Sequence, residues 1–306
     1  MADDYQLDYN GTVIGDGTVW DVTNWGGLEE WTSRNTDVTI PSGWGALGGS
    51  AFVAARVAQV AVESVDPVAI TLLEATLTPP PLSAPATLYP VRCKFPEREE
   101  LVAYGRVSRR SRPRTITTAL GLTSLAFELE FPDPRCYAYT PSTGTAPVYV
   151  AAATAWDLTA SSGTNAGTDL SVDSGADAGF DLVGTAGSGL VTVSNAGDVE
   201  TYPVLTFTAA NSAVNQWTLT NLTTGAVLTF STTVAPGDVM IVDLRPASST
   251  STTVVPVTIN GTAEYSAWVA PRTPMAFPPG ESVVRLDQLS GSGTLTCGIS
   301  WQSAYL

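Results

Sequence analysis

The sequence predicts a mainly β protein, in which a β-rich N-terminal part with one short helix precedes an antiparallel β-sandwich. Short apolar runs with period-two alternation recur along the chain, separated by Gly, Pro and Asn-Gly turn signals. Only one segment spaces its apolar residues as a helix does. The length of 306 residues suits two domains of ordinary size, which we expect at 1–145 and 146–306.

The first predicted strand places tyrosine and leucine on one face and polar residues on the other. These two sets are Tyr5, Leu7 and Tyr9 against Asp4, Gln6 and Asp8. The alternation predicts a half-buried strand, and Asn10-Gly11 predicts a hairpin turn after it. Residues 17–49 are expected to form a loop-rich stretch held by large aromatic side chains, Trp20, Trp25, Trp31 and Trp44. A further strand is predicted over residues 55–63.

A helix is predicted after Asp66, which is a good N-cap and precedes Pro67. Ile70, Leu73 and Leu77 continue at helical spacing, and the triple proline at 79–81 ends the helix. Leu125, Phe127, Leu129 and Phe131 alternate with polar or small residues and predict a strand with one wet face. Residues 140–147 are interpreted as an interdomain linker.

The second half is predicted to be almost entirely strand and turn. Strand candidates occupy 204–207, 217–219, 227–230, 240–242, 255–259, 283–286 and 295–301. Turn signals such as Asn260-Gly261 separate several of them, and this spacing is typical of an antiparallel sandwich. Residues 159–200 are rich in small and polar residues, and the sequence leaves open whether they form long loops or weak strands.

Catalytic chemistry finds little support in the sequence. Histidine is absent, which excludes Ser-His-Asp and Cys-His arrangements. No GxSxG motif, P-loop or dinucleotide-binding fingerprint is present. Neighbouring acids such as Glu99 and Glu100 point to opposite faces of a strand and rarely act as a pair. We therefore predict a protein without enzymatic activity, catalytic residues or cofactor.

Two further residue sets are candidates for a metal site and for a disulfide. Asp169, Asp173, Asp177 and Asp181 are spaced every four residues, which does not match the calcium loop of an EF-hand, so a solvated acidic loop is favoured over a metal site. Cys93, Cys136 and Cys297 are few and far apart, which predicts reduced thiols, with a Cys93–Cys136 bridge as the alternative.

The eight tryptophans raise the possibility of carbohydrate binding, because flat aromatic rings can stack on sugars. Trp217 and Trp301, however, fall on the apolar positions of alternating strands and are predicted to be core residues. The roles of Trp25, Trp31, Trp44 and Trp268 stay open at this level.

The net charge of −15 disfavours binding to free DNA or to anionic membranes. No apolar run approaches membrane-spanning length, and no secretion signal is expected from the acidic N-terminus. Basic residues concentrate in one segment that holds Arg106, Arg109, Arg110, Arg112 and Arg114. We predict that these arginines contact a protein partner, since arginine pairs with carboxylates in a bidentate manner; a solvated hairpin is the alternative.

Several short motifs of the second half resemble a known family. They are the segments 197–204 (GDVETYPV), 219–225 (LTNLTTG), 235–243 (APGDVMIVD), 278–283 (PPGESV) and 299–306 (ISWQSAYL). Their order is similar to that in the distal tail protein (Dit) of long-tailed phages. The N-terminal half matches in outline, with one short helix before a proline-rich break and a closing strand before Asp133-Pro134-Arg135.

The resemblance implies a galectin-like sandwich in the second half and a ring-forming domain in the first. It further implies a homo-hexamer at the phage tail tip, a virion structure assembled in the host cytoplasm. That ring would join the tail tube protein to the tip hub, with receptor-binding proteins and the tape measure protein as further partners. DNA would pass through the lumen without specific binding.

The acidic composition agrees with such a ring, because a negatively charged lumen would not retain DNA. We accordingly expect a net negative lumen, with residues 106–114 facing protein partners. Two alternatives are a carbohydrate-binding or adhesin module and another virion protein, such as a tail-tube or decoration protein.

Overall fold

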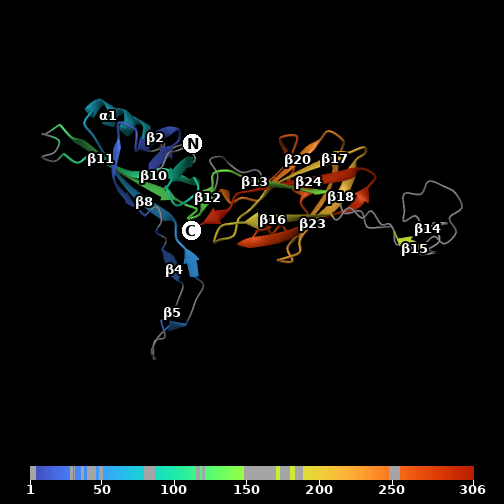
Figure 1. The fold of residues 1–306 in the computed structure, drawn as a ribbon. Coiled ribbons are helices and arrows are strands. Elements are labelled where there is room, and N and C mark those ends of the chain that lie inside the picture. Colours follow the sequence, from blue (N-terminus) through green and yellow to red (C-terminus); the bar gives the residue numbers. More distant parts are fainter. Residues whose placement is uncertain are drawn as a thin grey trace.

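The computed structural model describes residues 5–27, 30, 32–35, 38–39, 46–47, 51–78, 87–114, 118, 121–147, 170–172, 180–182, 189–247 and 256–306. Within these residues nearly all regular structure is antiparallel β-strand, so the predicted mainly β fold is confirmed. Two hydrophobic cores form, one in the N-terminal half and one in the C-terminal half. Figure 1 shows the two halves beside each other, with the two labelled chain ends between them.

The N-terminal half is built on a nine-stranded sheet. Its main path runs β2 (Thr12–Gly15), β1 (Gln6–Tyr9), β9 (Tyr89–Lys94), β10 (Leu101–Ser111), β11 (Thr123–Phe131), β8 (Arg56–Ser64) and β3 (Asp21–Gly26). Two short strands, β12 (Cys136–Ala138) and β25 (Ala304–Tyr305), extend it beside β10. Side chains of β1, β8, β11 and the helix share one core, so the sheet folds around its own apolar face.

The helix α1 (Pro67–Thr76) forms where the sequence predicts it. The Asp66 carboxylate accepts a hydrogen bond of 2.8 Å from the backbone N–H of Val68, which satisfies one of the free donors at the helix start. Ile70 and Leu73 are buried in the core shared with β8 and β11.

The first strand departs from its predicted half-buried state. All four residues of β1 are buried, including Gln6 and Asp8 on the polar face. Asp8 forms an ion pair with Arg92 of β9, which explains how a carboxylate is accommodated there. The predicted hairpin turn is confirmed, with positive φ angles of 49° at Asn10 and 86° at Gly11, as a two-residue hairpin of this type requires.

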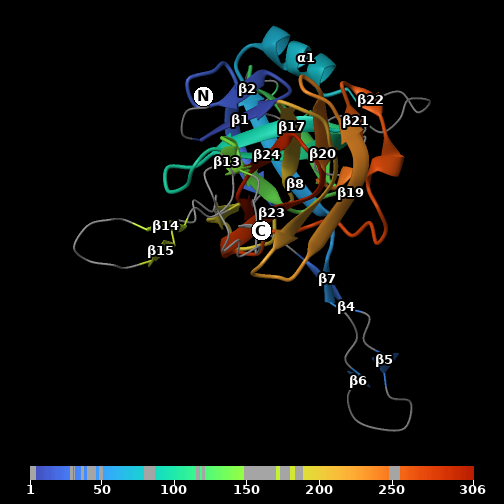
Figure 2. The same cartoon turned by 90° about the vertical axis from the view of Figure 1, so that its right-hand side faces the viewer.

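Short two-stranded ribbons project from the body. In the region predicted to be loop-rich, β4 (Ser33–Asn35) pairs with β7 (Ala51–Val53) and β5 (Val38–Thr39) pairs with β6 (Ala46–Leu47). Figure 2 shows both pairs leaving the main body. A third ribbon joins β14 (Leu170–Val172) to β15 (Phe180–Leu182). Trp31, Trp44, Asp169, Asp173 and Asp177 lie outside the described residues, as does the side chain of Asp181.

The C-terminal half is a sandwich of two antiparallel sheets. One runs β13 (Ser142–Pro147), β24 (Thr294–Trp301), β17 (Val204–Ala210), β20 (Val239–Asp243), β21 (Val257–Ile259) and β22 (Thr262–Ala263). The other runs β16 (Leu190–Asn195), β23 (Gly280–Gly291), β18 (Val214–Asn221) and β19 (Val227–Val234). A short 3-10 helix, η2 (Tyr265–Ala267), lies against β19.

The sandwich core contains the tryptophans that the alternation pattern assigned to it. Trp217 is fully buried, and Trp301 is buried as well. Trp268, whose role the sequence left open, is also buried and lies near the ring of Phe230. By contrast, Trp25 is half-buried in the N-terminal half, where its ring meets Phe95 edge-on.

The interpretation of residues 140–147 as a linker is wrong. Residues 142–147 form β13 and pair with β24 over six registered positions. The chain crosses between the halves a second time through β25, which pairs with β12 of the N-terminal sheet. The division at residue 145 itself stays a prediction.

All three cysteines are buried free thiols. A Cys93–Cys136 bridge is not formed, and the topology explains this, because β9 and β12 flank opposite edges of β10. Two strands separated by a third lie roughly 9–10 Å apart, whereas a disulfide needs Cα atoms within about 7 Å. No helix among the described residues is long and apolar enough to cross a membrane.

Candidate protein-interaction surface

The predicted arginine segment begins on β10, where a β-bulge sets the direction of each side chain. Val107 pairs with Leu129, but Arg109 rather than Ser108 pairs with Glu128. The extra residue reverses the alternation beyond it. Arg109 therefore lies on the outer face beside Glu128, while Arg110 pairs with the buried Phe127 and lies towards α1.

Two of the arginines hold the helix against the sheet. The guanidinium groups of Arg110 and Arg112 lie 3.6 Å and 3.3 Å from the carboxylate of Glu74 on α1. Arg110 also donates a hydrogen bond to the backbone carbonyl of Glu74. The Arg110 guanidinium thus lies against the last turn of the helix, where positive charge is favourable. These two residues contribute to packing within the subunit.

The remaining three arginines differ in how closely they pair with carboxylates of the same subunit. Arg106 donates through both Nε and Nη2 to one oxygen of Glu130, at 3.0 Å and 2.9 Å. Arg109 lies 3.8 Å from Glu128, yet its side chain is 74% exposed. Arg114 follows the end of β10 and is exposed, and no ion pair involves it within the described part of the chain. Arg109 and Arg114 thus offer most of their charge to solvent.

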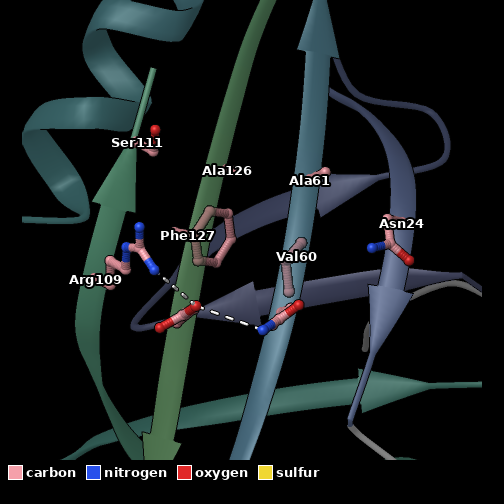
Figure 3. A pocket seen from close by; sticks show the side chains of 9 residues that line it. Asn24, Val60, Ala61, Arg109, Ser111, Ala126 and Phe127 are labelled. Carbon is pink, nitrogen blue, oxygen red and sulfur yellow. Dashed lines mark hydrogen bonds and ion pairs between the residues drawn. The ribbon is translucent and has the colours of Figure 1, made fainter. Parts of the chain in front are cut away.

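A shallow hollow lies beside Arg109 on the outer face of the sheet (Figure 3). Its volume is about 240 Å³, and small side chains, Ala61 and Ala126, belong to its lining. Arg109, Glu128 and Gln59 form a polar row across three strands, with 3.4 Å between the Gln59 amide nitrogen and Glu128. The hollow also contains Asn24 and Ser111, so hydrogen-bonding groups surround an apolar patch.

The same sheet has several strand edges without a partner strand in the described residues, among them the outer edge of β2. β3 ends the path beyond β8, and its far edge is open. On β10, β9 pairs only with residues 101–105, so residues 106–111 are paired solely by β11. Open edges expose rows of backbone donors and acceptors, which can pair with another chain.

Metal binding and thiol chemistry have no support in the described residues. These residues contain no group of three potential ligands placed to hold a metal. Burial raises the pKa of the Cys136 and Cys297 thiols, which keeps them protonated and unreactive. Sequence reasoning located the arginines but missed their carboxylate partners. Glu128 and Glu130 carried a signal, since both lie on the wet face of the predicted strand, whereas Glu74 had none.

A comparison with solved structures finds a similar fold over nearly the whole chain. The crystal structure of SPP1 Dit (gp 19.1), described as a paradigm of the hub adsorption apparatus in phages that infect Gram-positive bacteria, matches with a TM-score of 0.63. The match covers 98% of this chain and 99% of that chain at 12% identity. The Dit-like fold that the sequence motifs predicted is therefore confirmed.

Two baseplate structures of phage p2 in its activated conformation also match, one with Sr and one with Ca. Their TM-scores are 0.48 and 0.46, each at 9% identity and with 96% of both chains covered. No family model and no curated protein matches the sequence.

Proposed function

We propose that this chain is a non-enzymatic structural protein of a phage tail tip, with the role of a distal tail protein. The observation that carries the proposal is the likeness to SPP1 Dit, which extends over both halves of the chain. The motifs at 197–306 support it independently, because they come from the sequence and not from the fold. The absence of histidine from the chain favours a structural role over catalysis.

The N-terminal domain, residues 1–145, is proposed to close a hexameric ring. A cyclic ring requires two different surfaces on each subunit that complement each other. The open edges of β3 and of residues 106–111 on β10 offer two different surfaces of this kind, since β3 ends the sheet path and β10 lies within it. The sandwich, proposed as residues 146–306, would then project from the ring.

Charge supports the proposed path for DNA. Six copies, each of net charge −15, carry about −90 in total. A lumen with this sign lets DNA pass without specific binding. The exposed arginines, Arg109 and Arg114, are the members of the predicted set best placed to meet acidic groups of a protein partner.

The proposed neighbours follow from a position at the tail tip of the virion. They are the tail tube protein above, the tip hub below, and receptor-binding and tape measure proteins. The adhesin alternative predicts exposed aromatic side chains clustered on one face of the sandwich. Trp217, Trp268 and Trp301 are all buried, so nothing among them favours that alternative.

Imaging tests the ring directly. The purified chain is mixed with the lysate of a phage that encodes it. A tag on the chain locates it on virions by negative-stain microscopy, and mass photometry measures the free particles. We expect one hexameric ring at the tail tip and free particles of six times 31.9 kDa. Label along the whole tail would identify a tube protein, and label on the capsid a decoration protein.

Charge reversal tests the arginines separately. Arg109→Glu combined with Arg114→Glu is expected to lower ring assembly at least about tenfold, because two attractive contacts become repulsive. Arg285→Glu makes the same kind of charge change on the sandwich, where the side chain is 40% exposed. That control should assemble like the natural chain. Equal assembly of both variants would show that these arginines do not lie in the interface, and it would leave the ring proposal unaffected.

A further inference from the structure

A cleft of about 320 Å³ lies where the two halves of the chain meet. Its lining comes from the segment around β12 and from β17 and β24 of the sandwich: Tyr137, Tyr139, Pro141, Thr201, Tyr202, Val204, Arg245, Ser300, Trp301 and Gln302. The volume falls in the range of small-molecule sites, and the lining combines aromatic rings with a few polar groups.

Two tyrosines of the cleft each have an arginine guanidinium packed over the ring. The Arg92 guanidinium carbon lies 4.9 Å from the ring centre of Tyr139, and that of Arg135 lies 5.2 Å from the ring centre of Tyr202. Neither guanidinium lines the cleft. Each tyrosine of the lining therefore has a cation packed against its ring, which is favourable.

Both arginines are themselves held by carboxylates. Arg92 pairs with the buried Asp8 and lies 3.7 Å from Glu100. Arg135 lies 3.2 Å from Glu200 and 4.0 Å from Asp133. Because these pairs neutralise the cations and hold their positions, the two rings are preorganised without giving the cleft a strong charge.

Polar groups also line the cleft. Arg245 donates to Asp243 through Nε at 3.0 Å and Nη2 at 2.7 Å, which orients its planar group and leaves Nη1 outside this pair. The Gln302 amide nitrogen donates to the Ala138 carbonyl at 2.7 Å, which leaves the amide oxygen as an acceptor. The hydroxyl of Ser300 adds a group that both donates and accepts.

We propose that this cleft binds a pyranose unit of a polysaccharide. A pyranose has an apolar C–H face, which packs on a flat aromatic ring, and a rim of hydroxyls that needs both donors and acceptors. Tyr139 is 42% exposed and Pro141 is exposed as well, so the cleft opens to solvent and a glycan chain can continue outwards. Trp301 belongs to the lining but is only 7% exposed, so the two tyrosines supply most of the aromatic surface for a ligand.

Saturation-transfer NMR and calorimetry on the full chain test the proposal. The probes are glucose, galactose, rhamnose, N-acetylglucosamine and glucuronic acid, together with polymers of each class. We expect at least one of these sugars to bind. Tyr139→Ala should weaken that binding about tenfold or more, because it removes one of the two tyrosine rings of the site. Tyr265→Ala removes an equally accessible tyrosine, 52% exposed, from the sandwich and should leave binding unchanged.

A second variant, Arg245→Gln, keeps a hydrogen-bond donor and should weaken binding without altering the melting temperature by more than a few degrees. Two results would overturn the proposal: no sugar of the panel binding at about 10 mM, or Tyr139→Ala and Tyr265→Ala binding alike. The measurement does not depend on ring assembly. A ring without sugar binding would reject this cleft and leave the tail-tip role standing.

Discussion

Asp8 is a carboxylate that β1 carries into the interior. Its side chain is 3% exposed, accepts a 2.7 Å hydrogen bond from the Gly11 backbone and pairs with Arg92. Removing one partner of a buried pair leaves an uncompensated charge. We expect Asp8→Asn to lower the free energy of unfolding by about 2–4 kcal/mol, measured by urea denaturation of the full chain.

An ion pair that is more accessible to solvent provides the control for this change. Arg285 and Asp287 lie 2.8 Å apart on the sandwich, with side chains 40% and 19% exposed. Exposed pairs contribute little, so Asp287→Asn should cost less than about 1 kcal/mol. If both variants lower the free energy of unfolding by a similar amount, the buried Asp8 pair contributes no more than the accessible pair.

The same residue shows where sequence reasoning stops. Alternation correctly assigned Leu7, Tyr9 and the apolar set of β11 to the core. It also placed Asp8 on a wet face, because a single strand gives no sign that both of its faces will be covered. The information lay in Arg92, 84 residues away, and nothing local in the sequence connects the two.

The element that joins the two halves is the short strand β25. Its Ala304 is fully buried, and the Ala304 carbonyl accepts hydrogen bonds from the N–H groups of Asp198 and Val199 at 3.0 Å and 3.2 Å. Gly197 packs so closely that an added Cβ would lie 1.8 Å from the Ala304 oxygen. A side chain at position 197 cannot be accommodated without displacing β25.

We therefore expect Gly197→Ala to detach β25 from the junction. Hydrogen exchange should speed up at the amides of Ala138, Asp198 and Val199, which donate to Ser303 and Ala304. Gly298→Ala serves as the control, because its new Cβ would meet Thr206 at an ordinary 3.7 Å. Unchanged exchange in Gly197→Ala would mean that the strand tolerates the displacement.

Helix α1 offers a second test at the scale of an element. The Asp66 carboxylate bonds the Val68 N–H, and its replacement by alanine frees that donor. Asp66→Ala should cost about 0.5–2 kcal/mol in the free energy of unfolding, by chemical denaturation. Thr78→Ala, beyond the opposite end of the helix, removes a solvent-exposed hydrogen bond of 2.8 Å from the Thr78 hydroxyl to the Ala75 carbonyl and should have a smaller effect.

Elements with local signals were predicted well, and elements defined by distant partners were not. Asp66 and Pro67 mark the start of α1 within the helix itself, and the predicted helix is confirmed. Residues 142–147 contain Gly, Pro and Thr and resemble a linker, yet they form β13 because β24 supplies a partner more than 140 residues later. Likewise, the bulge that turns Arg109 outwards appears only once β10 is aligned with β11.

At the scale of the whole molecule, composition determines how stability responds to pH. The chain has no histidine, so few groups titrate near neutrality. Its buried acids with raised pKa values are tyrosines and thiols. Burial, with a contribution from nearby Tyr89, raises the pKa of Tyr9 to about 12. Burial, with the hydrogen bond to Glu99, raises the pKa of Tyr305 to about 12.

A raised folded-state pKa means that the folded protein disfavours the ionised form. The resulting stability is fully present below the unfolded pKa, about 9 for the thiols and 10 for the tyrosines, and is lost as the pH rises towards the folded value. We expect a nearly constant free energy of unfolding from about pH 6 to about pH 9 and a fall above it. For Tyr9 alone, the shift of two units corresponds to about 2–3 kcal/mol by pH 12.

Denaturant titrations between pH 6 and pH 11.5 measure this fall, roughly over the range in which these groups ionise. Tyr9→Phe should reduce the alkaline fall, because the phenol that must ionise in the unfolded chain is gone. Tyr265→Phe, which alters an exposed ring of the sandwich, should leave the fall unchanged. A fall that begins below pH 8 would contradict the assignment, since neither buried tyrosines nor buried thiols ionise in that range.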